Sequence, residues 1–147
     1  MNKKWDLRFL DLAYKISEWS KDPSTKVGAI IVDKQRRIIS TGYNGLPQTI
    51  EDSDEILYNR DLKYEHIIHA EVNAIIFAKC SIAGFTLYTV PFLPCSRCAS
   101  IYIQAGIARI VAPKNKLERW EENLNLSRKS FKESGVECVE YDIENFK

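Results

Sequence analysis

The chain has 147 residues and a mass of 17.0 kDa, which predicts a single domain over residues 1–147. Hydrophobic residues make up 45% of it and charged residues 28%, a balance that argues against disorder and against a fibrous repeat. Twenty-one Lys and Arg residues stand against twenty Asp and Glu residues, and this net charge of +1 argues against a domain that follows nucleic-acid phosphates.

The first element in chain order is an amphipathic helix predicted over residues 3–20. Its apolar residues recur at spacings of three and four, namely Trp5, Phe9, Leu12, Ala13, Ile16 and Trp19. Two apolar strands follow over residues 27–32 and 37–42, and the short polar link between them predicts an antiparallel hairpin. Residues 44–64 are polar and loop-like, with room for a short helix over 55–62. Loops of that length in compact domains are usually functional.

Helices and strands alternate in the second half of the chain. A helix begins at His69, with Gly84 beyond its end, and further helices are predicted over 95–104 and 117–133. Strands are predicted over 85–90, 108–112 and 136–141. The five strands with their helices predict an α/β fold built on one mixed five-stranded sheet.

The chain has no apolar run near the roughly 18–20 residues of a membrane span. Asp6, Arg8 and Asp11 interrupt the first residues, which therefore lack the apolar core of a secretory signal. We expect a cytoplasmic protein with no membrane partner and with reduced thiols. In that setting, four cysteines indicate metal ligands or buried thiols rather than disulfides.

Four residues form a candidate chemical site. Cys95 and Cys98 lie at positions i and i+3 of a predicted helix start, where both sulfurs point to one side and the helix N-terminus lowers thiol pKa values. His69 is at another predicted helix start, with one strand between the two helices. Three ligands of S, S and N type suit zinc and leave its fourth position open for a water, as in catalytic sites. Glu71 can then serve as a general acid–base beside that water.

Other interpretations of these residues exist. Cys-x-x-Cys alone also occurs in redox pairs, although the thioredoxin-like order of elements is missing here, and His-x-Glu alone is often a surface helix start. A non-catalytic zinc domain would need a fourth protein ligand, for which Cys80 is a candidate. Joined as His69-Ala70-Glu71 and Pro94-Cys95-Ser96-Arg97-Cys98, the residues match the signature of the zinc deaminases.

With these motifs and two more, the chain resembles the deoxycytidylate (dCMP) deaminases of the cytidine deaminase superfamily. The matching stretches are residues 22–29, 42–47, 69–75 and 94–99, and the resemblance runs from about Trp5 to Tyr141. It implies a three-layer α/β/α sandwich and zinc-dependent hydrolysis of dCMP to dUMP with release of ammonia, which supplies dUMP for thymidylate synthesis. By this resemblance, His69, Cys95 and Cys98 hold one catalytic zinc, and Glu71 shuttles protons.

The resemblance also assigns residues to the substrate. Asn44 would contact the deoxyribose hydroxyl, and the Ala70 backbone amide would contact the base carbonyl. Ser24, Thr25 and Lys26 precede the first strand, in a loop that borders the active site of this superfamily, so we expect them to bind the phosphate. The alternative for Lys26 is a solvated lysine at a strand edge.

Many relatives are homo-hexamers that dCTP activates and dTTP inhibits. By resemblance, Gly42, Tyr43, Asn44 and Gly45 form an effector-binding loop, with Mg²⁺ accompanying a bound triphosphate, and the chain forms a homo-oligomer. The glycines could equally be needed only for turn geometry. Alternative substrates are dCTP, adenosine in tRNA and cytosine in single-stranded DNA. The last two require a strip of positively charged residues that binds the flanking phosphates, and a net charge of +1 does not suggest one.

The remaining candidates have plainer interpretations. Some viral relatives bind a second zinc through Cys and His residues around the long loop, but residues 44–64 contain neither type, so one zinc per chain is expected. Cys80 and Cys138 are predicted to be buried thiols, and His66 to be a surface or core residue rather than a second-layer partner of the metal. Arg119 and Trp120 are assigned to a solvated helix start, with a place beside the substrate or an adjoining subunit as the alternative.

Overall fold

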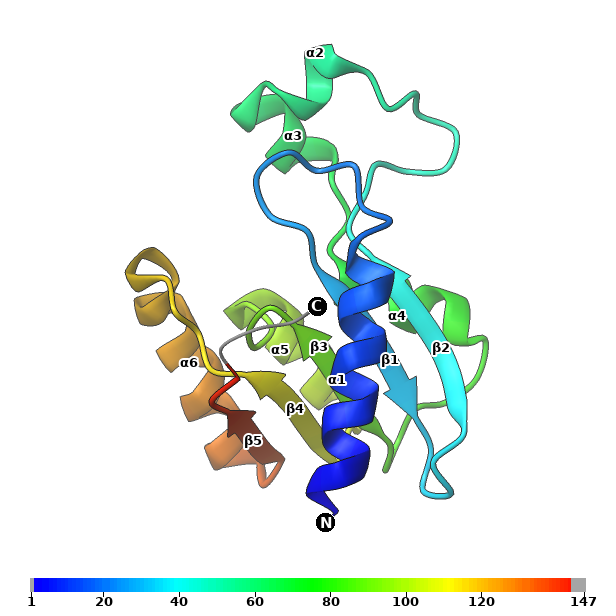
Figure 1. Ribbon diagram of the computed structural model, residues 1–147, viewed down its shortest axis with the longest axis vertical. Helices are drawn as coiled ribbons and strands as arrows, with labels where there is room; N and C mark the ends of the chain where they lie inside the picture. Colours follow the sequence, from blue (N-terminus) through cyan, green and yellow to red (C-terminus); the bar gives the residue numbers. More distant parts are fainter. Residues whose placement is uncertain (1, 144–147) are drawn as a thin grey trace.

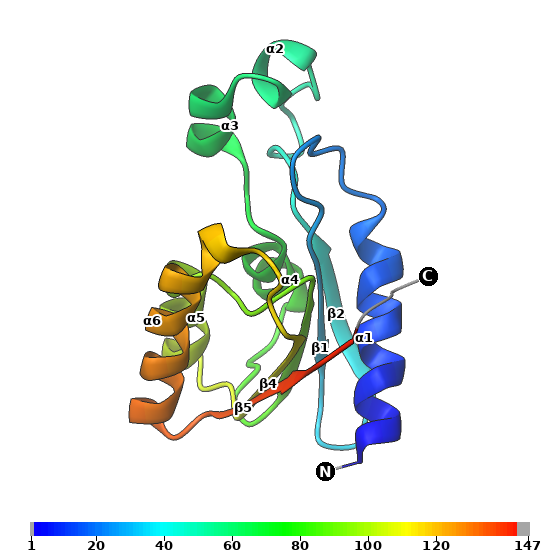
Figure 2. The same cartoon turned by 60° about the vertical axis from the view of Figure 1, so that its left-hand side comes forward.

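The computed structural model describes residues 2–143. In this part of the chain, a central sheet separates two layers of helices (Figures 1 and 2). Among the same residues, no helix is both long and apolar enough to span a bilayer.

The sheet has the strand order β2-β1-β3-β4-β5. Its strands are β1 (Gly28–Val32), β2 (Ile38–Tyr43), β3 (Thr86–Val90), β4 (Arg109–Pro113) and β5 (Glu137–Tyr141). β1 pairs antiparallel with both β2 and β3, whereas β3, β4 and β5 are parallel, so the predicted hairpin and the mixed five-stranded sheet are confirmed. The strand bounds agree with the prediction to within one residue.

Helices cover both faces of the sheet (Figure 2). α1 (Lys3–Ser17) packs on one face, and α4 (Ala70–Ala78), α5 (Ser96–Gln104) and α6 (Glu118–Ser134) lie on the other. This is the expected three-layer α/β/α sandwich. Because both faces are covered, β1 is buried along its whole length and is apolar throughout instead of alternating with polar residues.

α1 ends one turn earlier than its apolar periodicity predicts. The helix stops at Ser17, and the next residues form tighter turns in which Trp19 and Ser20 donate to the carbonyls of Ile16 and Ser17, each over 3.0 Å. Trp19 is consequently 59% exposed. The apolar spacing of residue 19 therefore does not mark a helical core position.

Residues 46–67, here called the arm, extend beyond the sheet (Figure 1). The arm contains two short helices, α2 (Asp54–Leu57) and α3 (Arg60–His66), in place of the single helix predicted over 55–62. Ser53 and Asn59 each cap one of them by accepting a hydrogen bond from a backbone N–H, so the second cap starts a new helix inside the predicted one. At the base of the arm, Gly45 and Ile68 exchange two backbone hydrogen bonds of 3.1 and 2.8 Å.

Gly42 sets the distance between β2 and α4. A Cβ atom at this position would lie 2.3 Å from the Ala70 carbonyl oxygen and 2.6 Å from the Ala74 nitrogen, far inside van der Waals contact. Ser40 adds a hydrogen bond of 2.7 Å to the Ala74 carbonyl. The start of α4 is thereby seated directly on the hairpin.

Candidate metal centre and adjoining pockets

The ends of two helices bring three ligand side chains together. His69 is the N-cap of α4, Cys95 is the N-cap of α5, and Cys98 lies in the first turn of α5. His69 Nδ1 is 3.2 Å from Cys98 Sγ and 3.5 Å from Cys95 Sγ, and the three ligand atoms all lie within 4.8 Å of one another. The prediction that two helix starts flanking one strand meet at one point is therefore confirmed.

The geometry of this cluster fits zinc. Tetrahedral ligation at about 2.0–2.1 Å for nitrogen and about 2.3 Å for sulfur places such atoms about 3.5 Å apart, close to the spacings of His69 from the two sulfurs. Cys80 is not part of the cluster, because it follows the far end of α4, about 13 Å of helix away from His69. With three protein ligands among residues 2–143, the cluster leaves a fourth position open.

The ionisation of Cys95 also favours a cation, whereas the hydrogen bond with Cys95 and burial raise the pKa of Cys98. Hydrogen bonding from Cys98 lowers the pKa of Cys95 to about 4, outweighing burial, and His69 contributes in the same direction. The hydrogen bond with Cys95 in turn raises the pKa of His69, while burial acts against it. A thiolate at the N-terminus of a helix is the form of cysteine that binds a metal.

The start of α5 is held by α6. The Asn123 side chain accepts from the Ser96 backbone N–H over 3.0 Å and donates to the Ser96 hydroxyl over 3.1 Å. One turn later, the buried Ser127 hydroxyl donates to the Pro94 carbonyl over 2.7 Å. Because Cys95 forms no side-chain cap of its own, these contacts fix the backbone that carries both cysteines.

Glu71 lies two residues after the histidine and is 4% exposed. Burial raises the pKa of its carboxyl group, although a hydrogen bond from its own backbone N–H and one of 3.3 Å from the Thr89 hydroxyl act against this. The buried Tyr102 hydroxyl donates to the Glu71 carbonyl over 2.7 Å and holds the first turn of α4 in place. Because burial raises its pKa, this carboxyl group is better able to return a proton that it has accepted.

A pocket of about 100 Å³, here called the inner pocket, adjoins the cluster. His69, Ala70, Glu71, Cys95 and Asn44 all contribute to its wall. Ser24 and Thr25 line it as well, so the structure brings seven of the residues predicted for metal, proton transfer and substrate to one cavity. As the first residue of α4, Ala70 has a backbone N–H that finds no partner within its own helix.

The hydrogen bonds of Asn44 restrict what it can offer a ligand. Its Nδ2 donates to the Thr25 carbonyl over 2.9 Å and to Asp22 Oδ2 over 3.3 Å, which uses both hydrogens. Its Oδ1 accepts one hydrogen bond, from the Val27 backbone N–H over 2.9 Å, and keeps a second lone pair. A ligand in the pocket would therefore meet Asn44 as an acceptor.

A wider pocket of about 390 Å³, here called the outer pocket, shares part of this wall. Ser24 and Thr25 line both pockets. Lys26 is exposed and lines neither, so its predicted contact with phosphate has no counterpart in these walls. The basic residues that line the outer pocket are Arg60, Lys63 and Arg119, with only Lys63 reaching the inner pocket as well.

Two residues outside the predicted binding set belong to the pocket walls. Lys63 lines both pockets although its sequence context is that of a polar surface helix. Trp120 also lines both, which favours the alternative that it borders the substrate, and its Nε1 is the only buried side-chain nitrogen or oxygen without a partner among the described residues. A ligand acceptor would satisfy such a donor. No local motif marked Lys63, whereas the position of Trp120 beside Arg119 at a helix start was a signal.

The Gly42–Gly45 segment borders a third pocket of about 550 Å³. Gly42, Tyr43 and Gly45 line it together with residues of α4, whereas the Asn44 side chain belongs to the inner pocket. None of the segment's glycines has a positive φ, so turn geometry does not explain them. Gly42 is required by its contact with α4, and Gly45 has open space around it.

The prediction that Cys80 is buried was wrong. α4 ends at Ala78, and Lys79 turns the chain outward with a left-handed φ of 58°, which leaves Cys80 exposed. Cys138 is half-buried on the edge strand β5, and burial raises the pKa of its thiol to about 11. His66 is an exposed residue in the last turn of α3, where its Nδ1 lies 2.7 Å from the Leu62 carbonyl, as expected for a surface role.

An α/β/α sandwich that holds a histidine and two cysteines beside a buried glutamate defines a metal-dependent deaminase. Residues 3–114 match the family model described as the cytidine and deoxycytidylate deaminase zinc-binding region, and the chain belongs to this family. It is 42% identical over 142 residues to an uncharacterized deaminase in the luxG 3′ region of Aliivibrio fischeri, covering 95% of both chains. It is 36% identical over 140 residues to the deoxycytidylate deaminase of Mus musculus, covering 90% of this chain and 77% of the mouse protein.

Solved structures share the fold. The apo dCMP deaminase of cyanophage S-TIM5 superposes with a TM-score of 0.76 at 24% identity, covering 95% of this chain and 99% of the phage chain. The same phage enzyme in complex with dCMP and dUMP gives a TM-score of 0.74. RibD of Acinetobacter baumannii gives 0.66 at 20% identity and is matched over 35% of its length.

Proposed function

We propose that this deaminase converts dCMP to dUMP with release of ammonia, using one zinc ion held by His69, Cys95 and Cys98. The observation that carries the proposal is the buried Glu71 carboxyl in the same small pocket as a three-ligand cluster. The deoxycytidylate deaminase of Mus musculus, to which the chain is similar, supports the choice of substrate. When bound, zinc supplies Lewis-acid activation of a water molecule.

Glu71 moves both protons of that water. Its carboxylate takes the first proton and delivers it to N3 of the cytosine ring, while the water oxygen forms a bond to C4. Glu71 then carries the second proton to the exocyclic amino group, and the C4–N bond breaks to release ammonia. The N3 proton and the new C4 carbonyl remain on dUMP, so the atoms of one water are fully accounted for.

The pocket wall orients the nucleotide for this reaction. The Ala70 N–H donates to the base carbonyl, and the free lone pair of Asn44 Oδ1 accepts from the deoxyribose hydroxyl. The sugar hydroxyl must be the donor, since both Nδ2 hydrogens of Asn44 are already engaged. The 5′-phosphate extends toward Ser24 and Thr25, which join the inner pocket to the basic outer pocket.

The decisive experiment compares wild type with Glu71→Gln, which keeps the shape of the side chain but cannot shuttle a proton. Loss of cytosine absorbance on incubation with dCMP is followed for both proteins, and zinc content is measured alongside. We expect one zinc per chain in each and a rate about 10²–10⁴-fold lower in the variant. If the wild-type protein deaminates dCTP, tRNA or single-stranded DNA but not dCMP, dCMP is not the substrate and the proposal is contradicted.

Effector control is part of the proposal. The pocket beside Gly42, Tyr43 and Gly45 is separate from the inner pocket and has room for a nucleotide, with about 550 Å³. dCTP with Mg²⁺ would activate and dTTP would inhibit through this segment. Rates of dCMP turnover that respond to neither nucleotide would contradict this assignment.

The last part of the proposal is that the chain forms a homo-oligomer. Ile76 and Phe77 are each 47% exposed on α4, beside the same pocket, and they offer an apolar surface for a second copy. Light scattering of the purified protein checks this, and a monomer at micromolar concentration would contradict it.

A further inference from the structure

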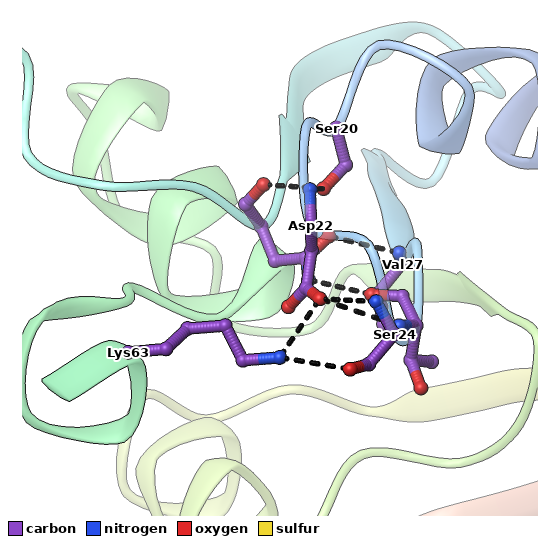
Figure 3. Close-up of polar contacts among 7 residues, drawn as sticks. Ser20, Asp22, Ser24, Val27 and Lys63 are labelled. Atoms are coloured by element: carbon purple, nitrogen blue, oxygen red, sulfur yellow. Dashed lines mark hydrogen bonds and ion pairs between the residues drawn. The ribbon is translucent and has the colours of Figure 1, made fainter. Parts of the chain in front are cut away.

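Lys63 connects the arm to the loop that precedes β1. Its side chain reaches from α3 and is 5% exposed, and its Nζ lies 3.0 Å from Asp22 Oδ1 and 3.1 Å from the Ser24 hydroxyl (Figure 3). Lysine is almost never buried to this extent unless it is paired. The contact therefore joins two segments that are 41 residues apart in the chain.

Asp22 is the centre of the connection. Besides Lys63, its Oδ1 accepts from the backbone N–H groups of Ser24 over 2.8 Å and Thr25 over 3.4 Å. Its Oδ2 accepts from Asn44 Nδ2 over 3.3 Å. One buried carboxylate thus links the lysine of the arm to the amide that we propose as the acceptor for the sugar.

We infer that Lys63 is a positioning residue for nucleotide binding, acting through Asp22 on Asn44 and on the backbone of residues 24–25. This rests on the proposed function. Removing the ammonium leaves the Asp22 carboxylate buried without its counter-ion, and the loop must rearrange to hydrate it. Its hydrogen bonds to Asn44 and to the two backbone N–H groups are then lost or misdirected.

The loss of Lys63 is expected to weaken substrate binding rather than slow the chemical step. The polar contacts of Lys63 go to Asp22 and Ser24, whereas Glu71 and the cysteines are held by α4, α5 and α6. A contact that orients the sugar in both ground state and transition state changes KM and leaves kcat near its wild-type value.

A second lysine provides a matched control. Lys21 also joins the loop before β1 to the arm, through an ion pair of 3.1 Å with Asp52, but its side chain is 70% exposed and lines neither pocket. Exposed pairs of this kind contribute little. Lys21→Met therefore removes an ion pair between the same two segments without touching the binding wall.

The experiment measures kcat and KM for dCMP in wild type, Lys63→Met, Lys63→Arg and Lys21→Met, all loaded with zinc. We expect Lys63→Met to raise KM by at least about tenfold with kcat within about threefold, Lys63→Arg to recover most of the loss, and Lys21→Met to match wild type. A fall in kcat at unchanged KM, or no change in either, would overturn the inference. If Lys63→Met does not fold, Lys63→Gln, whose amide can still donate to Asp22, replaces it.

A readout without substrate separates this inference from the proposed function. Should wild type fail to turn over dCMP, that function fails, but hydrogen exchange still tests the connection. The Val27 amide, which donates to Asn44 Oδ1, should exchange faster in Lys63→Met than in wild type and Lys21→Met. Equal exchange in all three proteins would overturn the positioning role.

Discussion

Replacing Gly42 with alanine tests how the hairpin seats the metal-binding helix. The added methyl group would lie 2.3 Å from the Ala70 carbonyl oxygen, where ordinary contact begins near 3.4 Å, so β2 and α4 must separate by about 1.1 Å. Both close atoms belong to backbone, which cannot rotate away as a side chain would. Because His69 and Glu71 are at the start of α4, the displacement passes directly to them.

The expected cost is larger for activity than for stability. Overpacking of this kind costs about 1–3 kcal/mol in the free energy of unfolding. A misplacement of about 1 Å between catalytic groups costs about 10²-fold in rate. Gly42→Ala should therefore remain folded at 25 °C while kcat/KM for dCMP falls by about two orders of magnitude.

Gly45→Ala is the control for this measurement. Nothing lies within 4 Å of a Cβ at that position, and its φ is not in the left-handed region, so the added methyl group meets no obstacle. Activity is followed by loss of cytosine absorbance and stability by thermal unfolding. If Gly42→Ala keeps kcat/KM within about threefold of Gly45→Ala, the packing argument is refuted.

Asp6→Asn removes the charge from a buried ion pair with Arg109 of 2.6 Å at the far end of the sheet, and should cost about 3–5 kcal/mol in urea unfolding without changing kcat. A loss below about 1 kcal/mol would mean that this pair is not a main support of the fold. Burial raises the pKa of Asp6, but hydrogen bonds from Arg109 and two tyrosines outweigh burial, so the pKa in the folded protein is lowered. The stabilisation is therefore present above the ordinary carboxyl pKa and is lost as the pH falls through the folded-state pKa. Acid unfolding should consequently depend less on pH in the variant. Asn123→Ala removes the partner of the Ser96 N–H and should weaken zinc retention by about 10–100-fold in chelator competition. Asn125→Ala, which alters only an exposed contact, serves as the control. Equal zinc retention in the two variants would contradict a supporting role for α6.

The ligand cluster could be predicted from sequence because its chemistry is local. Each ligand stands at a helix start, and the alternation of helix and strand dictates that these starts meet at one edge of the sheet. His69, Cys95 and Cys98 needed only that topology to come within 4.8 Å of one another. The alternation also predicted the mixed sheet, and the apolar and β-branched runs predicted the strand bounds, whereas the three layers were implied by the family resemblance.

The wall of the binding pocket could not be predicted in the same way. Lys63 follows Asp22 by 41 residues and stands in no pattern that distinguishes it from a solvated surface residue. Asp22 begins a stretch shared with the family, but nothing in that stretch indicates Lys63 as its partner. Their burial depends on how the arm folds back over the loop, which is a tertiary event. For the same reason, Lys26 was the expected phosphate contact, since it lies next to Ser24 and Thr25 in the chain although it is exposed in the fold.

The paired base of the arm has a consequence for protein engineering. Gly45 and Ile68 are hydrogen-bonded neighbours, so the chain leaves the body and returns to it at the same place. A segment with adjacent ends can be exchanged for one of different length at little cost in loop-closure entropy. Grafting a different arm between these two residues, with a lysine retained opposite Asp22, would reshape the mouth of the outer pocket and leave the helices that carry the metal ligands untouched. The arm that lines the outer pocket and the helices that carry the metal ligands are in this sense separate parts of the fold.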